Sequence, residues 1–310
     1  MTKIALGTIP FGTTVDEKTS FAILDRFVEA GGTRIDTSNN YPFWLAGAAG
    51  DESETTIGRW LAARDVRDQV IISTKCGAKP VTPGDTTMDH LEGLSAGAVR
   101  AAIEGSLRRL GTDRVDVYWA HVEDRSVPLE EQVAVFGELV AAGKARETGV
   151  SNHPAWRLER ARGIARATGA APFANVQLRH SYLRPRPGVV LPEGGHVQLG
   201  EDMLDYVRTE GLGLWVYTSL LAGAYSSRAD RPIPAWYEHP GTTRRLAALR
   251  EVAGELGATP NQVVLAWLAA QDIVPIVGAS SVEQLEELLG AQKITLDEEL
   301  RRRLDDPDLA

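Results

Sequence analysis

The sequence of 310 residues contains a single cysteine, Cys76, which excludes an internal disulfide framework and a zinc site built from several cysteines. Histidine pairs of the kind that bind metals are also missing. There is no H-x-H or H-E-x-x-H motif, and His153 and His180 do not stand at ligand spacing from His121. We therefore predict that the protein binds no metal.

Long apolar runs and an excess of basic charge are missing as well. No run approaches the ~20 apolar residues that a membrane span needs, and the first residues lack the order of a signal peptide. Lys and Arg number 33 against 42 Asp and Glu, so the net charge of -9 lacks the basic footprint of a nucleic-acid binder. We expect a cytoplasmic protein that has no membrane or nucleic-acid partner and holds any anionic ligand locally.

What the sequence does contain is a regular alternation of strand and helix patterns, in a chain that is 43% hydrophobic and 24% charged. Short apolar or β-branched runs predict strands, and apolar residues at helical spacing predict the segments between them. The predicted strands cover 4–12, 33–37, 70–74, 115–120, 145–150, 173–177, 213–218 and 273–277. The predicted helices cover 16–30, 52–63, 96–110, 129–142, 157–167, 202–209, 244–256, 260–270, 282–289 and 297–304.

Eight strands with crossover helices indicate one (β/α)8 barrel, the TIM-barrel fold, over residues 1–310, with its active site at the C-terminal ends of the strands. A doubly wound sheet is the competing fold, but no G-x-G-x-x-G follows the first strand. The longest irregular segments, 41–50, 78–94, 183–199 and 219–240, all follow strands. They are therefore candidates for substrate walls and a cofactor lid at the catalytic face.

Polar side chains recur at the predicted strand ends. Each has a structural explanation when taken alone: Asp36 could cap a helix, Lys75 could be a solvated loop end, and His121 could be a hydrogen-bonded core residue. Together they converge on one face, as a barrel enzyme requires. The set consists of Asp36, Lys75, His121, Ser151, Asn152, Gln177, Tyr217 and Thr218, with Tyr41 five residues after Asp36.

Four of these residue types suggest delivery of a proton. A free tyrosine has a pKa near 10 and is a poor donor to a carbonyl oxygen unless a cation such as Lys75 stabilises the phenolate of Tyr41. Asp36 would hold Lys75 in its charged form, and His121 would orient the carbonyl oxygen. An alternative is an aldolase that forms a Schiff base through Lys75, but that chemistry needs a neutral amine, which Asp36 opposes.

The sequence resembles the aldo-keto reductases along nearly its whole length. The resemblance implies a (β/α)8 barrel that uses a nicotinamide cofactor, with Tyr41 as the general acid of a tetrad completed by Asp36, Lys75 and His121. The motifs that carry it are GGTRIDTSNNY (31–41), ISTK (72–75), DVYWAH (116–121), GVSN (149–152), NVQ (175–177) and TPNQVVLAWL (259–268).

The same resemblance implies contacts to the cofactor. It places Ser151, Asn152 and Gln177 on the nicotinamide carboxamide and stacks the Tyr217 ring on the nicotinamide. A hydroxyl and two amides can satisfy the carboxamide group. Backbone amides in the loop after the seventh strand could hold phosphate without net positive charge. The residues implied along the pyrophosphate are Thr218, Ser219, Leu220 and Gly223.

The match loosens after the eighth strand, where the chain reads Gly278-Ala279-Ser280-Ser281-Val282-Glu283-Gln284-Leu285. NADPH-selective members usually have Arg where Gln284 stands and often Asn where Leu288 stands. Ala279, Ser280 and Ser281 could still hydrogen-bond a 2′-phosphate at the start of the helix, or the two serines could simply cap it. We expect NADPH as the first choice of cofactor and leave NADH open.

The substrate is expected to be a small aldehyde or ketone. Trp44, Trp119 and Trp236 could supply an aromatic wall beside a polar floor, although scattered surface aromatics have the same pattern. A third reading is a regulatory subunit, because potassium-channel β subunits also look like aldo-keto reductases. The identity of the carbonyl compound and the oligomeric state are left open.

Overall fold

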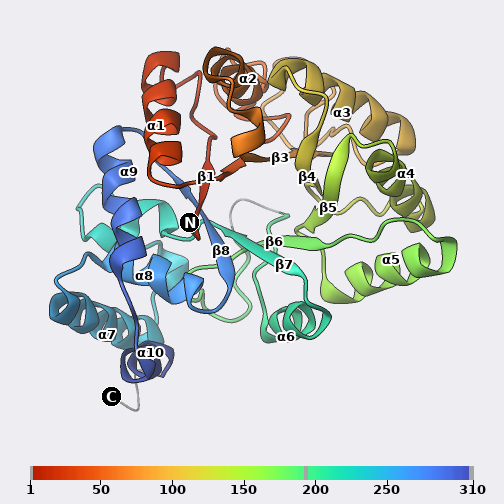
Figure 1. Ribbon diagram of the computed structural model, residues 1–310. Helices are drawn as coiled ribbons and strands as arrows, with labels where there is room; N and C mark the ends of the chain where they lie inside the picture. The colour runs from red at the N-terminus through yellow and green to blue at the C-terminus, as the bar shows by residue number, and fades with distance from the viewer. Residues whose placement is uncertain (1–2, 192–194, 307–310) are drawn as a thin grey trace.

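A closed barrel of parallel strands forms the centre of the computed structural model, which describes residues 3–191 and 195–306 (Figure 1). Each strand pairs with the next, and the last pairs with the first. The strands are β1 (Ala5–Gly7), β2 (Arg34–Asp36), β3 (Ile71–Cys76), β4 (Val115–Ala120), β5 (Ala145–Ser151), β6 (Asn175–Arg179), β7 (Gly213–Tyr217) and β8 (Ile273–Gly278).

The α-helices of the described residues surround this barrel (Figure 1). They are α1 (Glu17–Glu29), α2 (Glu52–Arg64), α3 (Ala96–Leu110), α4 (Leu129–Ala141), α5 (Ala155–Thr168), α6 (Glu201–Glu210), α7 (Pro240–Leu256), α8 (Pro260–Ala269), α9 (Val282–Leu289) and α10 (Glu298–Asp305). The predicted (β/α)8 barrel is confirmed. The first strand, predicted over 4–12, ends at Gly7 because turns begin at Ile9. Among the helices the largest shift is at α7, which begins at Pro240 rather than near 244, because proline suits the first turn of a helix.

Alternation along the strands decides which side chains face the barrel interior. In β4, Val117 and Trp119 point inward, whereas Tyr118 points outward and packs on Phe136 of α4. A small inner cluster of Ala5, Val117, Trp119 and Trp215 fills the barrel, with the two tryptophan rings 5.7 Å apart. This apolar plug supports the polar residues one layer higher, at the C-terminal ends of the strands.

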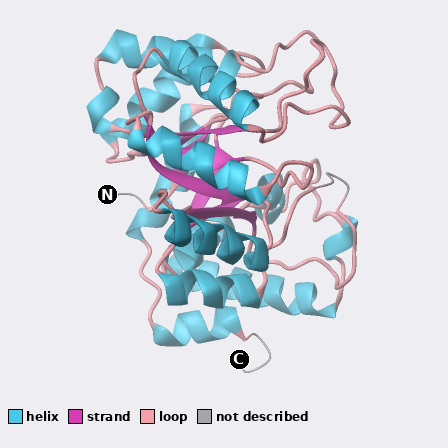
Figure 2. Ribbon diagram, turned by 90° about the vertical axis from the view of Figure 1, so that its right-hand side faces the viewer, coloured by secondary structure: helices cyan, strands magenta, loops and turns pink. Residues whose placement is uncertain are grey.

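The long connections gather at that same end. Figure 2 shows the loops extending from one end of the barrel, with the N-terminus at the other. They include the segments after β2, β3, β6 and β7 that the sequence identified, and the last of these contains two short 3-10 turns, Leu221–Ser226 and Ala235–Tyr237. No helix among residues 3–191 and 195–306 is both long and apolar enough to cross a membrane.

Helices α2 and α3 approach each other closely at Gly58. A Cβ added there would lie 2.0 Å from the carbonyl oxygen of Arg109, far inside van der Waals contact. The same interface buries the carboxylate of Glu54, which accepts a 2.7 Å hydrogen bond from Arg109 Nε. The absence of a side chain at residue 58 therefore determines how closely these two helices pack.

We predict that Gly58→Ala destabilises the protein by roughly 2 kcal/mol, because the methyl group must push the backbone of α3 away. Gly254→Ala in α7 is the matched control, since an added Cβ there meets nothing within 4 Å. The control should stabilise by up to about 1 kcal/mol, as alanine favours the helix. Urea unfolding of both variants measures the difference. Equal effects of the two substitutions would contradict the packing argument.

His153, directly after the end of β5, is a buried histidine held in its neutral form. Its Nδ1 lies 2.7 Å from the carbonyl oxygen of Ser151, which fixes the ring orientation. Burial lowers its pKa to about 4, despite the opposing effect of the Ser151 carbonyl. An unfolded histidine titrates near 6.5, so the unfolded chain binds more protons between these two values.

Neutral His153 therefore makes its full contribution to the free energy of unfolding above pH 6.5. This contribution is lost as the pH falls toward 4. Asparagine does not titrate, and its amide can still donate to the Ser151 carbonyl. We therefore expect the free energy of unfolding of His153→Asn to fall by about 3 kcal/mol less on acidification than that of the parent. Urea unfolding at pH 7 and pH 4.5 tests this, with His90→Asn at an exposed loop position as the control. An unchanged pH dependence in His153→Asn would contradict it.

Candidate active site

A buried ion pair lies at the centre of the polar layer above the tryptophan plug. Lys75 Nζ donates to Asp36 Oδ2 at 2.7 Å and to the carbonyl oxygen of Thr37 at 2.6 Å. The second carboxylate oxygen of Asp36 accepts from Ser73 Oγ at 2.7 Å and from Gln177 Nε2 at 3.2 Å. Four hydrogen bonds thus satisfy two charges that are almost wholly removed from solvent.

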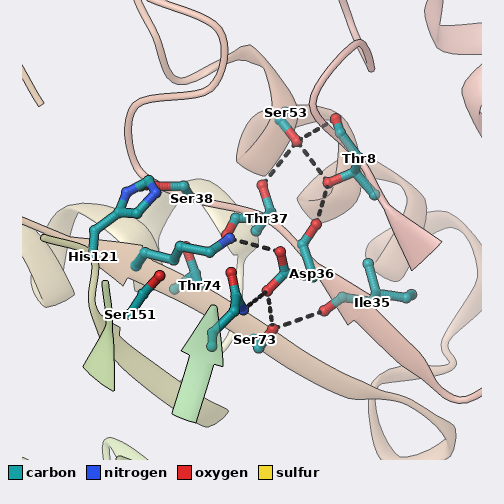
Figure 3. A network of polar contacts seen from close by, with 12 residues as sticks. Thr8, Ile35, Asp36, Thr37, Ser38, Ser53, Ser73, Thr74, His121 and Ser151 are labelled. Atoms are coloured by element: carbon teal, nitrogen blue, oxygen red, sulfur yellow. Dashed lines mark hydrogen bonds and ion pairs between the residues drawn. The ribbon is translucent and has the colours of Figure 1, made fainter. Parts of the chain in front are cut away.

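A second layer of hydroxyl groups fixes the strand end that carries Asp36. Figure 3 shows Asp36 between Ser73 on one side and the Thr37, Ser53 and Thr8 hydroxyls on the other. Ser53 Oγ lies 2.8 Å from Thr37 Oγ1 and donates to the Thr8 carbonyl, while Thr8 Oγ1 donates to the carbonyl oxygen of Asp36. Ser53 belongs to α2, so the first turn of that helix helps to orient the carboxylate.

Lys75 is held as an ammonium ion. Burial alone would favour the neutral amine, but the Asp36 carboxylate and the Tyr41 hydroxyl outweigh it and raise the pKa of Lys75 above its ordinary value. The side chain has no exposed surface. A fixed positive charge therefore stands inside the barrel mouth, directed by one carboxylate and one carbonyl.

Tyr41 lies above this charge, at the start of the loop after β2. Lys75 Nζ is 4.7 Å from the centroid of its ring, and its edge-to-face neighbours are His121 at 5.8 Å and Trp44 at 6.0 Å. Burial and the Asp36 carboxylate raise the pKa of the Tyr41 hydroxyl, whereas Lys75 lowers it. Burial outweighs the effect of Lys75, so the phenol keeps its proton at neutral pH.

His121 follows β4 and is neutral at ordinary pH. Burial lowers its pKa well below the usual value, and the charges of Lys75 and His196 act in the same direction. A hydrogen-bond chain fixes the ring: Asn40 Nδ2 donates to the Ala78 carbonyl, Ser38 Oγ donates to Asn40 Oδ1, and His121 Nδ1 lies 3.2 Å from Ser38 Oγ. With the Ser38 proton already used, this chain places the His121 proton on Nδ1.

The ends of β5, β6 and β7 bring the next predicted residues together. Asn152 Oδ1 accepts from the Tyr217 hydroxyl at 2.6 Å and from the Val197 amide at 3.1 Å. Its Nδ2 donates to the carbonyl oxygen of His121 and to Ser151 Oγ, both at 3.1 Å. Its backbone is left-handed, with φ at 60°. The Asn152 amide therefore joins three strand ends to the segment before α6.

The loop after β7 bends sharply. Thr218, Leu221, Ala222 and Gly223 all have positive φ, and the Ser219 hydroxyl donates to the Val216 carbonyl, which ties the turn to the barrel. None of the hydrogen bonds found among the described residues uses the backbone N–H of Ser219 or Leu220. Two backbone donors are thus available beside the barrel mouth.

The loop after β8 leads from Gly278 and the buried Ala279 into α9. Ser281 caps the helix by accepting from the Gln284 amide, and Gln284 Oε1 in turn accepts from the amide and the hydroxyl of Ser280. Ser281 therefore caps the helix, which is the alternative to phosphate binding that the sequence left open. The turn itself, residues 278–285, contains no Lys or Arg that could replace the missing arginine, and Leu288 is buried in the core.

The three tryptophans proposed as a substrate wall occupy different places. Trp44 is 43% exposed and lies against Tyr41, and Trp236 is partly buried with an unpartnered Nε1. Trp119, in contrast, has no exposed surface and lies one layer below His121, where it packs on Trp215. It forms the floor under the site rather than a wall.

Ser73, Ser38 and His196 are among the residues of the site that the sequence reasoning missed. Ser73 stands two residues before Lys75 and so shares its face of β3, a signal that was available. Ser38 and His196 gave none, because loop conformation alone brings Ser38 to His121 and the exposed His196 ring to within 5.2 Å of the Tyr217 ring. Within the described residues, no three His, Cys, Asp or Glu side chains come together as metal ligands.

Comparisons with known proteins identify the family of the chain. The model of the Aldo/keto reductase family matches residues 3–308. An uncharacterized oxidoreductase, YrpG of Bacillus subtilis (strain 168), is 30% identical over 99% of this chain and 92% of its own length. Norsolorinic acid reductase stcV of Emericella nidulans is 30% identical, over 96% of this chain and 75% of its own.

A third relative is the aryl-alcohol dehydrogenase (NADP(+)) of Phanerodontia chrysosporium, which is 28% identical over 96% of this chain and 78% of its own length. Family members act on small carbonyl compounds and generally use NAD(P)H. With a family model over nearly its whole length and a barrel of the expected topology, the chain belongs to the aldo/keto reductase family of oxidoreductases.

Proposed function

We propose that the protein reduces an aldehyde or ketone to an alcohol with NADPH, and that Tyr41 is the general acid. The observation that carries the proposal is the buried ammonium of Lys75, 4.7 Å from the ring of a tyrosine that keeps its proton. A bound nicotinamide cofactor supplies a hydride and no proton. The protein must therefore provide the proton itself, and Tyr41 is the group built to do so.

The donors at the barrel mouth fit such a cofactor. Ser151 and Gln177 offer a hydroxyl and an amide at neighbouring strand ends, and the free backbone amides of Ser219 and Leu220 suit a phosphate. The side-chain amide of Asn152, in contrast, has no free donor or acceptor, because it makes four hydrogen bonds within the protein. To bind a carboxamide, Asn152 would exchange one of these bonds, most simply one made by its Nδ2.

The charges and protons at the tetrad suit carbonyl reduction. As Tyr41 gives its proton to the substrate oxygen, negative charge develops on the phenol, and the ammonium of Lys75 stabilises it. Asp36 keeps Lys75 charged and in place. His121 is neutral and so does not repel Lys75. With its proton on Nδ1 toward Ser38, its Nε2 can only accept a hydrogen bond, such as one from the hydroxyl of the alcohol product.

The same observations count against the alternatives. A Schiff-base aldolase needs a free amine, whereas the Lys75 ammonium donates to Asp36 and to the Thr37 carbonyl inside the barrel. A purely regulatory role would leave the buried tetrad without a purpose. The exposed Trp44 beside Tyr41 favours an aromatic carbonyl substrate, in line with the printed name of the aryl-alcohol dehydrogenase relative. A cytoplasmic location remains part of the proposal.

Tyr41→Phe should lower kcat for reduction of an aromatic aldehyde at least about 100-fold, because it removes the proton donor. Binding of NADPH, followed by quenching of tryptophan fluorescence, should change by no more than about twofold, since the ring remains. Tyr206→Phe, where the hydroxyl lies between α6 and α5 on the outside of the barrel, is the matched control and should keep full activity. Full activity of Tyr41→Phe would refute the assignment.

The cofactor preference follows from the loop after β8. Hydroxyls and a helix N-terminus, without a cation, would favour NADPH over NADH by less than about tenfold, or 1.4 kcal/mol. Gln284→Arg should widen this preference by at least about tenfold, because a guanidinium binds a phosphate dianion in a bidentate fashion.

Fluorescence titration of both proteins with both cofactors measures the two ratios. Gln69→Arg, at an exposed position just before β3 and so at the other end of the barrel, controls for the added charge alone and should leave the ratio unchanged. If Gln284→Arg alters neither affinity, the 2′-phosphate does not lie at this turn.

A further inference from the structure

A separate cavity of about 440 Å³ lies outside the barrel, among α6, α7, α8 and α10. Figure 1 shows these helices along one part of the outer ring, away from the strand ends of the tetrad. The side chains that the argument uses are His180, Arg184, Arg208, Arg245, Trp267 and Arg301. None of them belongs to the site described above.

The cavity is positively charged in a chain whose net charge is -9. Four arginines line it against two carboxylates, those of Glu201 and Asp305. Glu201 is paired with Arg184 at 2.6 Å, and Asp305 accepts from the indole nitrogen of Trp267. The formal excess is about two positive charges, which is the charge that a phosphate monoester dianion balances.

Two of the four guanidinium groups are available for a ligand. Arg245 is held by the carbonyl oxygens of Leu304 and Asp305, so its role is to add charge and shape. The guanidinium groups of Arg208 and Arg301, in contrast, make no ion pair or hydrogen bond with any residue in the described part of the chain, although both residues line the cavity. Unpaired arginine forks facing one cavity are typical of an oxyanion site.

His180 provides an independent indication of a missing partner. The residue is only 6% exposed, and its ring stacks on the Trp267 indole at an interplanar angle of 29°, with centroids 6.0 Å apart. Its backbone amide donates to the Tyr217 carbonyl, but its ring makes no hydrogen bond to residues 3–191 or 195–306. Its ring nitrogens are not among the wholly buried unpartnered atoms, so a group that enters the cavity can reach the ring and accept its N–H.

The titration of His180 agrees with this. Burial lowers its pKa to about 4, and the nearby Arg184 and Arg245 lower it further than Glu201 raises it. The ring is therefore neutral at pH 7 and adds a hydrogen-bond donor without adding charge.

We propose that this cavity binds a phosphate monoester that carries a flat organic group. Arg208 and Arg301 would hold the phosphate, and the His180 and Trp267 rings would form the floor against which the organic group lies. The inference does not depend on the reductase function, because none of these side chains belongs to the tetrad or to the loops after β7 and β8 that are proposed for the cofactor.

Calorimetric titration of the intact protein with phenyl phosphate, inorganic phosphate and benzoate tests the proposal. Phenyl phosphate should bind at least about tenfold more tightly than either of the others. The double variant Arg208→Gln with Arg301→Gln should weaken phenyl phosphate at least about tenfold, since both phosphate ligands are removed. Both positions are exposed and unpaired, so the fold should be unaffected. Arg250→Gln on α7 is the matched control and should bind as the parent does.

A second measurement follows the ring resonances of His180, which should shift on addition of phenyl phosphate in the parent and not in the double variant. Absence of binding, binding unchanged in the double variant, or an equal loss in Arg250→Gln would each overturn the proposal. If benzoate bound as tightly as phenyl phosphate, the site would not require a phosphate group. If inorganic phosphate bound as tightly, the site would not require a flat organic group. Either result would overturn the proposal. Phenyl phosphate held at the cofactor site instead would leave His180 and the double variant unaffected.

Discussion

The site depends on one constraint, which is that a lysine ammonium without exposed surface must be kept charged inside a protein. Moving two isolated charges from water into the barrel costs several kcal/mol each, and only close, fully bonded geometry offsets that cost. Asp36, the Thr37 carbonyl and Ser73 supply that geometry. The hydroxyls of Ser53 and Thr8 then hold the strand end that carries Asp36. A charge placed this rigidly needs no reorganisation when it stabilises a developing phenolate.

The strand geometry of the barrel explains why so much of this could be predicted from sequence. Side chains alternate across each strand, so polar residues at successive strand ends must converge once the strands close into a ring. Lys75, Ser151 and Gln177 were located in this way. The apolar layer below these residues was harder to predict from the sequence. Trp119 is in register with Lys75, and it fills the space that Gly149 leaves, since a Cβ at residue 149 would lie 2.4 Å from the indole. Sequence alone did not reveal that this tryptophan belongs to the plug.

Properties that depend on loops and on burial could not be predicted. The sequence argument expected Lys75 to govern the pKa of Tyr41, but burial has the larger effect and reverses the net direction. Ser38 reaches His121 only because the chain turns back after β2, a path that no residue pattern specifies. The same limit applies to Asn152. From its residue type a polar contact could be expected. Which groups it bonds could not, because one of them, the Val197 amide, lies in a loop whose path the sequence does not specify.

Asn152 also joins the parts of the molecule that the two proposals treat separately. Through Oδ1 it holds Tyr217, whose carbonyl accepts the backbone amide of His180, and it holds the Val197 amide just before α6. The floor of the outer cavity and the edge of the tetrad site are therefore both attached to the end of β7. Because one side-chain amide cannot bond an additional partner without releasing one, any ligand that takes a hydrogen bond from Asn152 loosens this junction. The constraint at Asn152 is geometric, whereas the constraint at Lys75 is electrostatic.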